Sequence, residues 1–167
     1  MDTLRSTLWV GSTYSHVEIV VQRLLGGKKT LPRPMAVYRE GNCVLTPGEY
    51  IENPWYFSAL LVSSYDVDTV VLGYRIGEPF NPYPPATAGA FNRNLVGVVI
   101  TNDVLETSQI GESIRLLRLA GANDICIVAD TTQDIVDTNF IEDIPMVTYG
   151  YEALKEMLSV KVLIPPW

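Results

Sequence analysis

Short apolar runs and amphipathic stretches alternate along the second half of the chain. The apolar runs predict strands at 69–72, 95–101, 124–129, 146–148 and 160–164. The run at 69–72, TVVL, is short and rich in β-branched residues, as is typical of a strand that is buried on both faces. Apolar positions at helical spacing predict helices near 110–120 and 151–158. Strands that alternate with helices need crossover connections, so the pattern predicts an α/β fold with a mainly parallel sheet and flanking helices.

The first half of the chain has a more mixed pattern. Helices are expected at 14–25 and 53–64, and short strands at 35–39 and 42–45. The first helix ends at the pair Gly26-Gly27, which favours a helix C-terminus. The second helix begins with Asn53 as its N-cap and Pro54 at its first helical position.

The length of 167 residues and an apolar content of 47% allow one domain with a substantial core. We expect a single domain over 1–167, with a helix and hairpin region over 1–52 that forms a small N-terminal hood or hairpin, and an α/β core over 53–167. The segment 74–94 lacks periodicity and contains four prolines between Glu78 and Pro85. Loops of this length are uncommon inside a compact domain and often act as lids or partner surfaces.

The net charge of −7 and the lack of a basic cluster beyond Lys28-Lys29 argue against a nucleic-acid partner. No apolar run approaches the roughly 18–20 residues that cross a bilayer. The N-terminus lacks the basic start and apolar segment of an export signal, so we expect a cytoplasmic location and no membrane partner. Cys43 and Cys126 are far apart and lack neighbouring ligand types, so no metal site is expected.

A buried strand, a polar loop and an amphipathic helix follow one another between residues 95 and 122. Backbone N–H groups at such a helix start can hold a phosphate. The polar residues at this position are Asn102, Asp103, Glu106, Thr107 and Ser108. The right-handed crossover rule places this loop on the same edge of the sheet as the loop 73–77. Helix capping is the structural alternative, because it uses the same N–H groups.

Four sequence segments suggest a family. They are GNCVLTPGEY (41–50), DTVVLGYRIGEP (68–79), VVITNDVLETSQIG (98–111), and IPMV (144–147) followed by YEALKEML (151–158). In this order they resemble the hairpin, the pyrophosphate loop, the ribose-phosphate loop and the closing strand and helix of the type I phosphoribosyltransferases, orotate phosphoribosyltransferase in particular. The resemblance covers about residues 41–158 and implies a phosphoribosyltransferase-like fold.

This resemblance implies a reaction in which a base nitrogen displaces pyrophosphate from phosphoribosyl pyrophosphate, with magnesium on the leaving group. Asp103 matches the second acid of the family's ribose-binding pair, and Asn102 replaces the first. Glu106 and Thr107 match the next two positions, and Ser108 replaces a glycine. The resemblance assigns Gly73, Arg75 and Gly77 to the second phosphate.

The chain departs from the family pattern in its cations, because it has no lysine between Thr30 and Leu154. Arg93 is the only basic residue of the segment 78–94 and, with Asp103, is the candidate for a catalytic role. Three hypotheses remain open. The first is a catalytically degenerate protein, a pseudoenzyme that binds a phosphorylated ribose or nucleotide, and the second is an active phosphoribosyltransferase that uses magnesium. The third is a structural protein whose partner contacts come from 79–85, the aromatic residues 55–57 and Trp167. A homo-oligomer or an assembly with a partner protein is expected.

Overall fold

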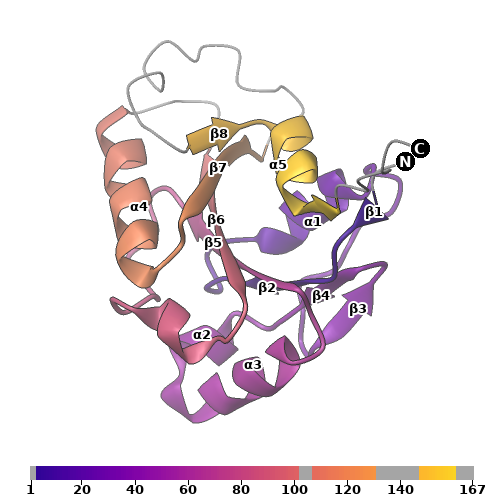
Figure 1. Ribbon diagram of the computed structural model, residues 1–167, viewed down its shortest axis with the longest axis horizontal. Coiled ribbons are helices and arrows are strands. Elements are labelled where there is room, and N and C mark those ends of the chain that lie inside the picture. The colour runs from indigo at the N-terminus through magenta and orange to yellow at the C-terminus, as the bar shows by residue number, and fades with distance from the viewer. Residues whose placement is uncertain (1–2, 102–106, 131–146, 161–167) are drawn as a thin grey trace, which may run out of the picture.

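The computed structural model describes residues 3–101, 107–130 and 147–160 of the chain. Among these residues, seven strands form one sheet through the middle of the molecule (Figure 1). In spatial order they are β3 (Tyr38–Glu40), β4 (Cys43–Leu45), β2 (Thr7–Val10), β5 (Thr69–Arg75), β6 (Asn94–Thr101), β7 (Asp124–Ala129) and β8 (Val147–Tyr149). Neighbouring strands are parallel except for β3, which is antiparallel to β4. A separate antiparallel pair consists of β1 (Thr3–Leu4) and β9 (Ser159–Val160).

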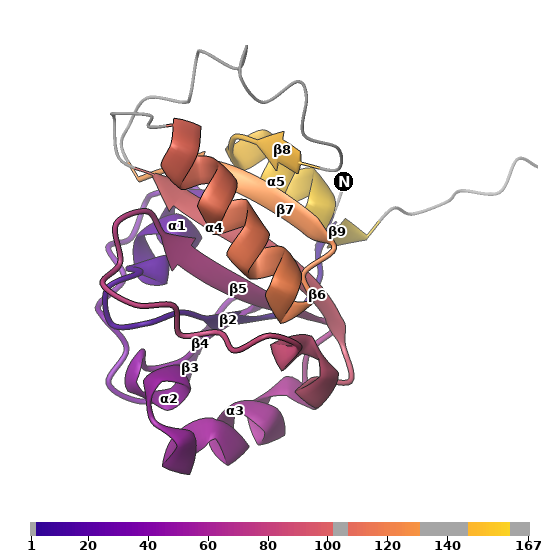
Figure 2. The ribbon, with the colours of Figure 1, turned by 90° about the vertical axis from the view of Figure 1, so that its left-hand side faces the viewer.

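Helices cover both faces of the sheet. The α-helices are α1 (Val17–Leu24), α2 (Glu49–Glu52), α3 (Phe57–Ser64), α4 (Thr107–Ala120) and α5 (Tyr151–Leu158), and the 3-10 helices are η1 (Pro54–Tyr56) and η2 (Thr87–Ala90). Figure 2 shows α4 in front of the sheet, with α1 and α5 behind it. None of the described helices has the length and apolar character that a membrane span requires.

The core has two halves, one on each face of the sheet. Along β2, Leu8 and Val10 pack with residues of α3 and α4, whereas Trp9 packs with residues of α1 and α5. All three side chains are fully buried. A buried side chain of this kind contributes about 1.5–3 kcal/mol, so alternate residues of one short strand stabilise both helical layers.

The α/β architecture expected from the sequence is confirmed, with a mostly parallel sheet and flanking helices. The expected strands at 69–72, 95–101 and 124–129 correspond to β5, β6 and β7. Asn53 caps the 3-10 helix that precedes α3, because its side chain accepts a hydrogen bond from the Trp55 N–H at 3.1 Å.

The N-terminal part differs from the expected hood. Within residues 3–52, β3 and β4 form an antiparallel hairpin, but both strands belong to the main sheet, as does β2, which lies between β4 and β5. Strand β2 was not predicted because its four residues, TLWV, are all buried and are too few to show a periodic pattern. The phosphoribosyltransferase-like form of the fold is not confirmed.

Candidate functional site

The order of the strands places a candidate site beside β2. From β2 the chain passes through α1 to β3 and β4 on one side, and β5 then lies on the other side. Open α/β sheets bind ligands at such a reversal, outside the carboxyl ends of the strands. Two segments lie at this point, namely the loop Gly11–His16 after β2 and the segment 76–83 after β5.

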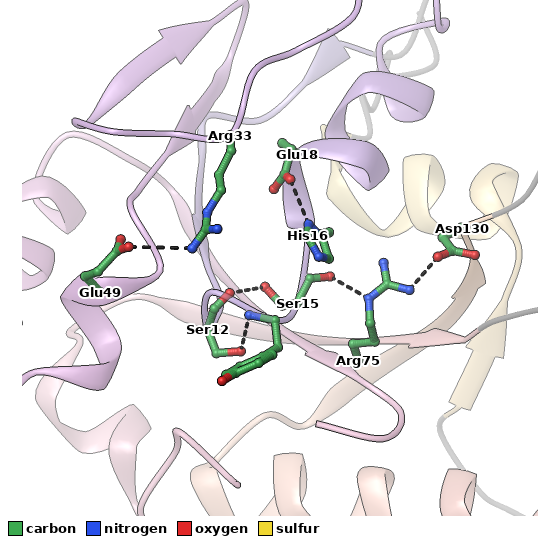
Figure 3. A network of polar contacts seen from close by, with 9 residues as sticks. Ser12, Ser15, His16, Glu18, Arg33, Glu49, Arg75 and Asp130 are labelled. Carbon is green, nitrogen blue, oxygen red and sulfur yellow. Dashed lines mark hydrogen bonds and ion pairs between the residues drawn. The ribbon is translucent and has the colours of Figure 1, made fainter. Parts of the chain in front are cut away.

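The loop Gly11–His16 is held together largely by its own serines. The Ser12 side-chain oxygen accepts a hydrogen bond from the Tyr14 N–H at 3.1 Å, and the Ser12 carbonyl accepts from the N–H and the hydroxyl of Ser15 at 3.1 and 2.8 Å. The Ser12 hydroxyl donates to the Glu78 carboxylate at 2.7 Å. Figure 3 shows the contacts among the serines. The N–H groups of Tyr14 and Ser15 therefore already have acceptors within the chain.

Glu52, the last residue of α2, provides an acceptor for Thr13. One oxygen of its carboxylate accepts from the Thr13 N–H at 2.6 Å and from the Thr13 hydroxyl at 2.7 Å. Carboxylates that accept backbone N–H bonds make short, charge-assisted hydrogen bonds. The position that an external anion could occupy at the Thr13 N–H is thus taken by a carboxylate of the protein.

Arg75, the last residue of β5, joins the loop to the neighbouring strands. Its guanidinium donates to the Ser15 carbonyl at 3.2 Å and forms an ion pair with Asp130, just after β7 (Figure 3). The Arg75 N–H donates to the Glu78 carboxylate at 2.9 Å. Burial raises the pKa of Glu78, although the hydrogen bonds from Arg75 and Ser12 act in the opposite direction. Glu78 therefore carries a carboxylate that is partly removed from water.

His16 and Glu18 occupy the start of α1. His16 has a left-handed backbone conformation with φ 52°, and a ring nitrogen lies 3.2 Å from the Glu18 carboxylate. The Glu18 side chain is 11% exposed, whereas that of His16 is 44% exposed. The first turn of α1 therefore carries the largely buried carboxylate of Glu18 and no lysine or arginine.

The strand–loop–helix arrangement here has the same order as a P-loop, in which Gly-x-x-x-x-Gly-Lys-Ser/Thr lies between a strand and a helix. Counted from Gly11, that spacing places His16 at the second glycine, Val17 at the lysine and Glu18 at the hydroxyl residue. Val17 is buried against the sheet and carries no charge. A P-loop protein also holds magnesium with an aspartate, whereas the neighbouring strand β4, CVL, contains no carboxylate. The loop Gly11–His16 thus lies where a phosphate loop would lie, but the side chains that would contact phosphate and magnesium are replaced.

The residues predicted from the sequence have different locations. Asn102, Asp103 and Glu106 lie outside the described residues, and the side chains of Thr107 and Ser108 at the start of α4 are not described either. Those predictions remain untested.

Three of the other predicted residues belong to one edge of the sheet. Gly73 lies within β5, where an added Cβ would be 2.4 Å from a Val17 methyl group. Arg75 and Gly77 follow at the carboxyl end of the same strand, and Gly77 has φ 89°. The fourth, Arg93, precedes β6 at the opposite edge, where its guanidinium donates to carbonyl oxygens at the end of α3. The structure therefore does not bring Arg93 together with Arg75.

Comparison with known proteins identifies a family. The chain matches the family model PduV-EutP, described as "Ethanolamine utilisation - propanediol utilisation", over residues 5–142. It is also similar to the propanediol utilization protein PduV of Citrobacter freundii, with 26% identity over 138 residues. That similarity covers 83% of this chain and 92% of the relative.

These matches overturn the resemblance to the type I phosphoribosyltransferases, and with it the degenerate-phosphoribosyltransferase and pseudoenzyme interpretations. They provide no evidence for the active transferase or for the structural protein. The resemblance was misleading for a physical reason. Apolar strands followed by glycines, acids and hydroxyl residues occur at the carboxyl edge of many parallel sheets, because strands end there and helices are capped there. The segments 68–79 and 98–111 have that general pattern.

Proposed function

The chain belongs to the PduV-EutP family, and we propose on that premise that it takes part in propanediol utilisation without binding a nucleoside triphosphate at the loop Gly11–His16. The name of the Citrobacter freundii relative supports the first half of the proposal. The observation that carries the second half is the contact between Thr13 and Glu52, in which a carboxylate of the chain occupies the loop.

The charges around the loop oppose a bound triphosphate. Glu52 and Glu78 both contact loop residues, and Val17 stands where a P-loop has the lysine that would compensate for their charge. Two like unit charges about 4 Å apart repel by roughly 4 kcal/mol at the effective dielectric constant of about 20 near a protein surface. A triphosphate would have to overcome this repulsion without the lysine that normally contacts its terminal phosphates.

Three backbone donors of the loop are also occupied. The N–H groups of Thr13, Tyr14 and Ser15 donate to Glu52, to the Ser12 side chain and to the Ser12 carbonyl, respectively. Phosphate binding at a loop of this kind depends on free N–H groups. An incoming phosphate would have to replace these internal bonds before it gained its own.

Nucleotide binding tests the second half of the proposal. The melting temperature of the wild-type chain is measured with ATP or GTP and magnesium, beside a P-loop protein that retains its lysine. A ligand at about 100 times its Kd would stabilise the chain by roughly 2.7 kcal/mol, which raises the melting temperature by several degrees. We expect no change in the melting temperature of this chain. A magnesium-dependent increase with either nucleotide would overturn the proposal that the loop binds no nucleoside triphosphate.

Growth of the source organism tests the first half. The gene is deleted, and growth is followed on 1,2-propanediol, on ethanolamine and on glucose. We expect slower growth on propanediol, restored by the wild-type gene, and unchanged growth on glucose. Unchanged growth on propanediol, or a defect confined to ethanolamine, would contradict a role in propanediol utilisation.

A further inference from the structure

The contact between Glu52 and Thr13 joins two segments that are 39 residues apart in the sequence. Glu52 ends α2, a helix of four residues whose N-cap, Gly48, offers no side-chain hydrogen bond. A helix this short is not stable by itself, because nucleation is unfavourable and few intrahelical bonds offset it. The position of α2 must therefore depend on its contacts with the rest of the protein.

Both ends of α2 contact the loop at the same residue. At its C-terminal end, Glu52 accepts two short hydrogen bonds from Thr13, at 2.6 and 2.7 Å. At the N-terminal end, a Cβ added to Gly48 would lie 2.4 Å from the Thr13 nitrogen. The backbone of Gly48 therefore packs directly against the backbone of Thr13, and the Glu52 carboxylate fixes the C-terminal end of α2.

The position of α2 also shapes a neighbouring pocket. A pocket of about 530 Å³ lies between α2, Phe57 and the segment 80–87, and Ile51 and Glu52 are among its lining residues. Phe80, on the opposite side of this pocket, makes an edge-on contact with Tyr14 of the loop, with ring centroids 5.8 Å apart. A movement of α2 away from Thr13 would thus change this pocket as well as the loop.

We propose that Glu52 is a built-in latch: its carboxylate, rather than a bound ligand, fixes α2 on the loop Gly11–His16 and keeps this corner of the protein closed. In many nucleotide switches, mobile segments beside the phosphate loop are ordered by the terminal phosphate and its magnesium ion. In this chain a carboxylate supplies the ordering contact permanently. The inference rests on the proposed function in one respect, namely that the loop holds no nucleotide phosphate.

Hydrogen exchange tests the latch in the nucleotide-free protein. The amide of Thr13 reports on the loop, and the amide of Asn53, which donates to the Glu49 carbonyl at 3.0 Å, reports on α2. In the Glu52→Ala variant we expect both amides to exchange faster by roughly tenfold or more, with exchange in β5 and β6 unchanged. Glu52→Gln keeps an acceptor oxygen without the charge and should give an intermediate rate.

Glu49→Ala is the matched control. Glu49 lies on the same helix and forms an exposed ion pair with Arg33 at 3.6 Å, away from the loop. We expect this variant to exchange at the wild-type rate at Thr13. The Glu52→Ala variant should also be cleaved faster by chymotrypsin near Tyr50, because opening of the latch frees the backbone of α2 for the protease.

Two results would overturn the latch. One is unchanged exchange at Thr13 in a folded Glu52→Ala protein, and the other is an equal increase throughout β5 and β6, which would make Glu52 a general stabiliser. If Glu52→Ala does not fold, Thr13→Val removes only the hydroxyl donor, and wild-type exchange at Asn53 would then count against the latch. Binding of ATP or GTP by the wild-type chain would refute the proposed function but would leave these exchange results to decide the latch separately.

Discussion

The hydroxyl of Tyr83 lies 2.7 Å from the carbonyl oxygen of Gly73 and 2.9 Å from that of Val10. Gly73 belongs to β5 and Val10 ends β2, so one side chain from the proline-rich segment connects the two central strands. Tyr83 is 1% exposed, and burial raises the pKa of its hydroxyl well above the ordinary value. The hydroxyl therefore stays protonated and acts as a donor between the strands.

Removal of that hydroxyl should measurably destabilise the fold. Tyr83→Phe keeps the ring but leaves a buried carbonyl without this donor, so we expect a loss of about 1–2 kcal/mol in the free energy of unfolding. Tyr65→Phe is the control, because Tyr65 is 66% exposed and should lose less than about 0.5 kcal/mol. Urea denaturation measures both variants, and equal losses would show that the Tyr83 hydroxyl does not stabilise the strands.

Arg75 should contribute more to stability than an arginine in a surface ion pair. Its side chain is 14% exposed, and that of Asp130 is 20% exposed. We expect Arg75→Met to lose about 1.5–3 kcal/mol, since hydrogen bonds to a charged group are removed and Asp130 loses its partner. Asp130→Asn in the same background should add little, which a double-mutant cycle tests. Arg115→Met, which removes an exposed pair with Glu112, should cause no measurable loss.

The parts of the fold that could be predicted are those with long, regular patterns. Strands β5, β6 and β7 are six to eight residues long, although only 69–72 of β5 was predicted, and α4, of 14 residues, has an apolar stripe over 110–120. Strand β2 has four residues and gave no such signal. Because β2 lies between β4 and β5, missing it also concealed the point at which the order of the strands reverses.

The candidate site could not be predicted for a related reason. The spacing from Gly11 is informative only when β2 and α1 are known to flank the loop, and His16 and Val17 replace the residues that a P-loop motif requires. The contact between Thr13 and Glu52 depends on how α2 packs, which local sequence does not specify. The polar segment after β6 was therefore favoured over the loop after β2.

The backbone at Ala86 offers a route to a more stable protein. Ala86 has φ 63°, a left-handed conformation that is unfavourable for residues with a Cβ, and its side chain is exposed. Ala86→Gly should raise the free energy of unfolding by roughly 0.5–1 kcal/mol, after the larger unfolded-state entropy of glycine is subtracted. Ala90→Gly, at the end of η2 and without a positive φ, should instead lower it. Thermal unfolding of the two variants provides the comparison, and a lower melting temperature for Ala86→Gly would refute the strain argument.

The raised pKa of Glu78 predicts how stability depends on pH. Its pKa in the folded protein lies above the ordinary 4.5, mainly because burial disfavours the charged form. The folded state therefore holds this proton more tightly than the unfolded state. The stabilisation from Glu78 is fully present below the unfolded pKa and is lost as the pH rises through the folded pKa. Between these two pKa values, the wild-type protein should lose stability relative to Glu78→Gln as the pH increases.

Glu112 provides a control for which stability should depend on pH in the opposite direction. Arg115 lowers the pKa of Glu112, so its contribution is present above the unfolded pKa and is lost as the pH falls through the folded pKa. Urea denaturation at a series of pH values from about 3 to 7 should therefore give differences from wild type that slope in opposite directions, above the unfolded pKa for Glu78→Gln and below it for Glu112→Gln. The same slope for both variants would mean that burial does not control the ionisation of Glu78. Opposite slopes for the two variants would show that ionisation of the Glu78 carboxylate, which accepts from Ser12, lowers the stability of the fold, because the fold holds this carboxylate away from water.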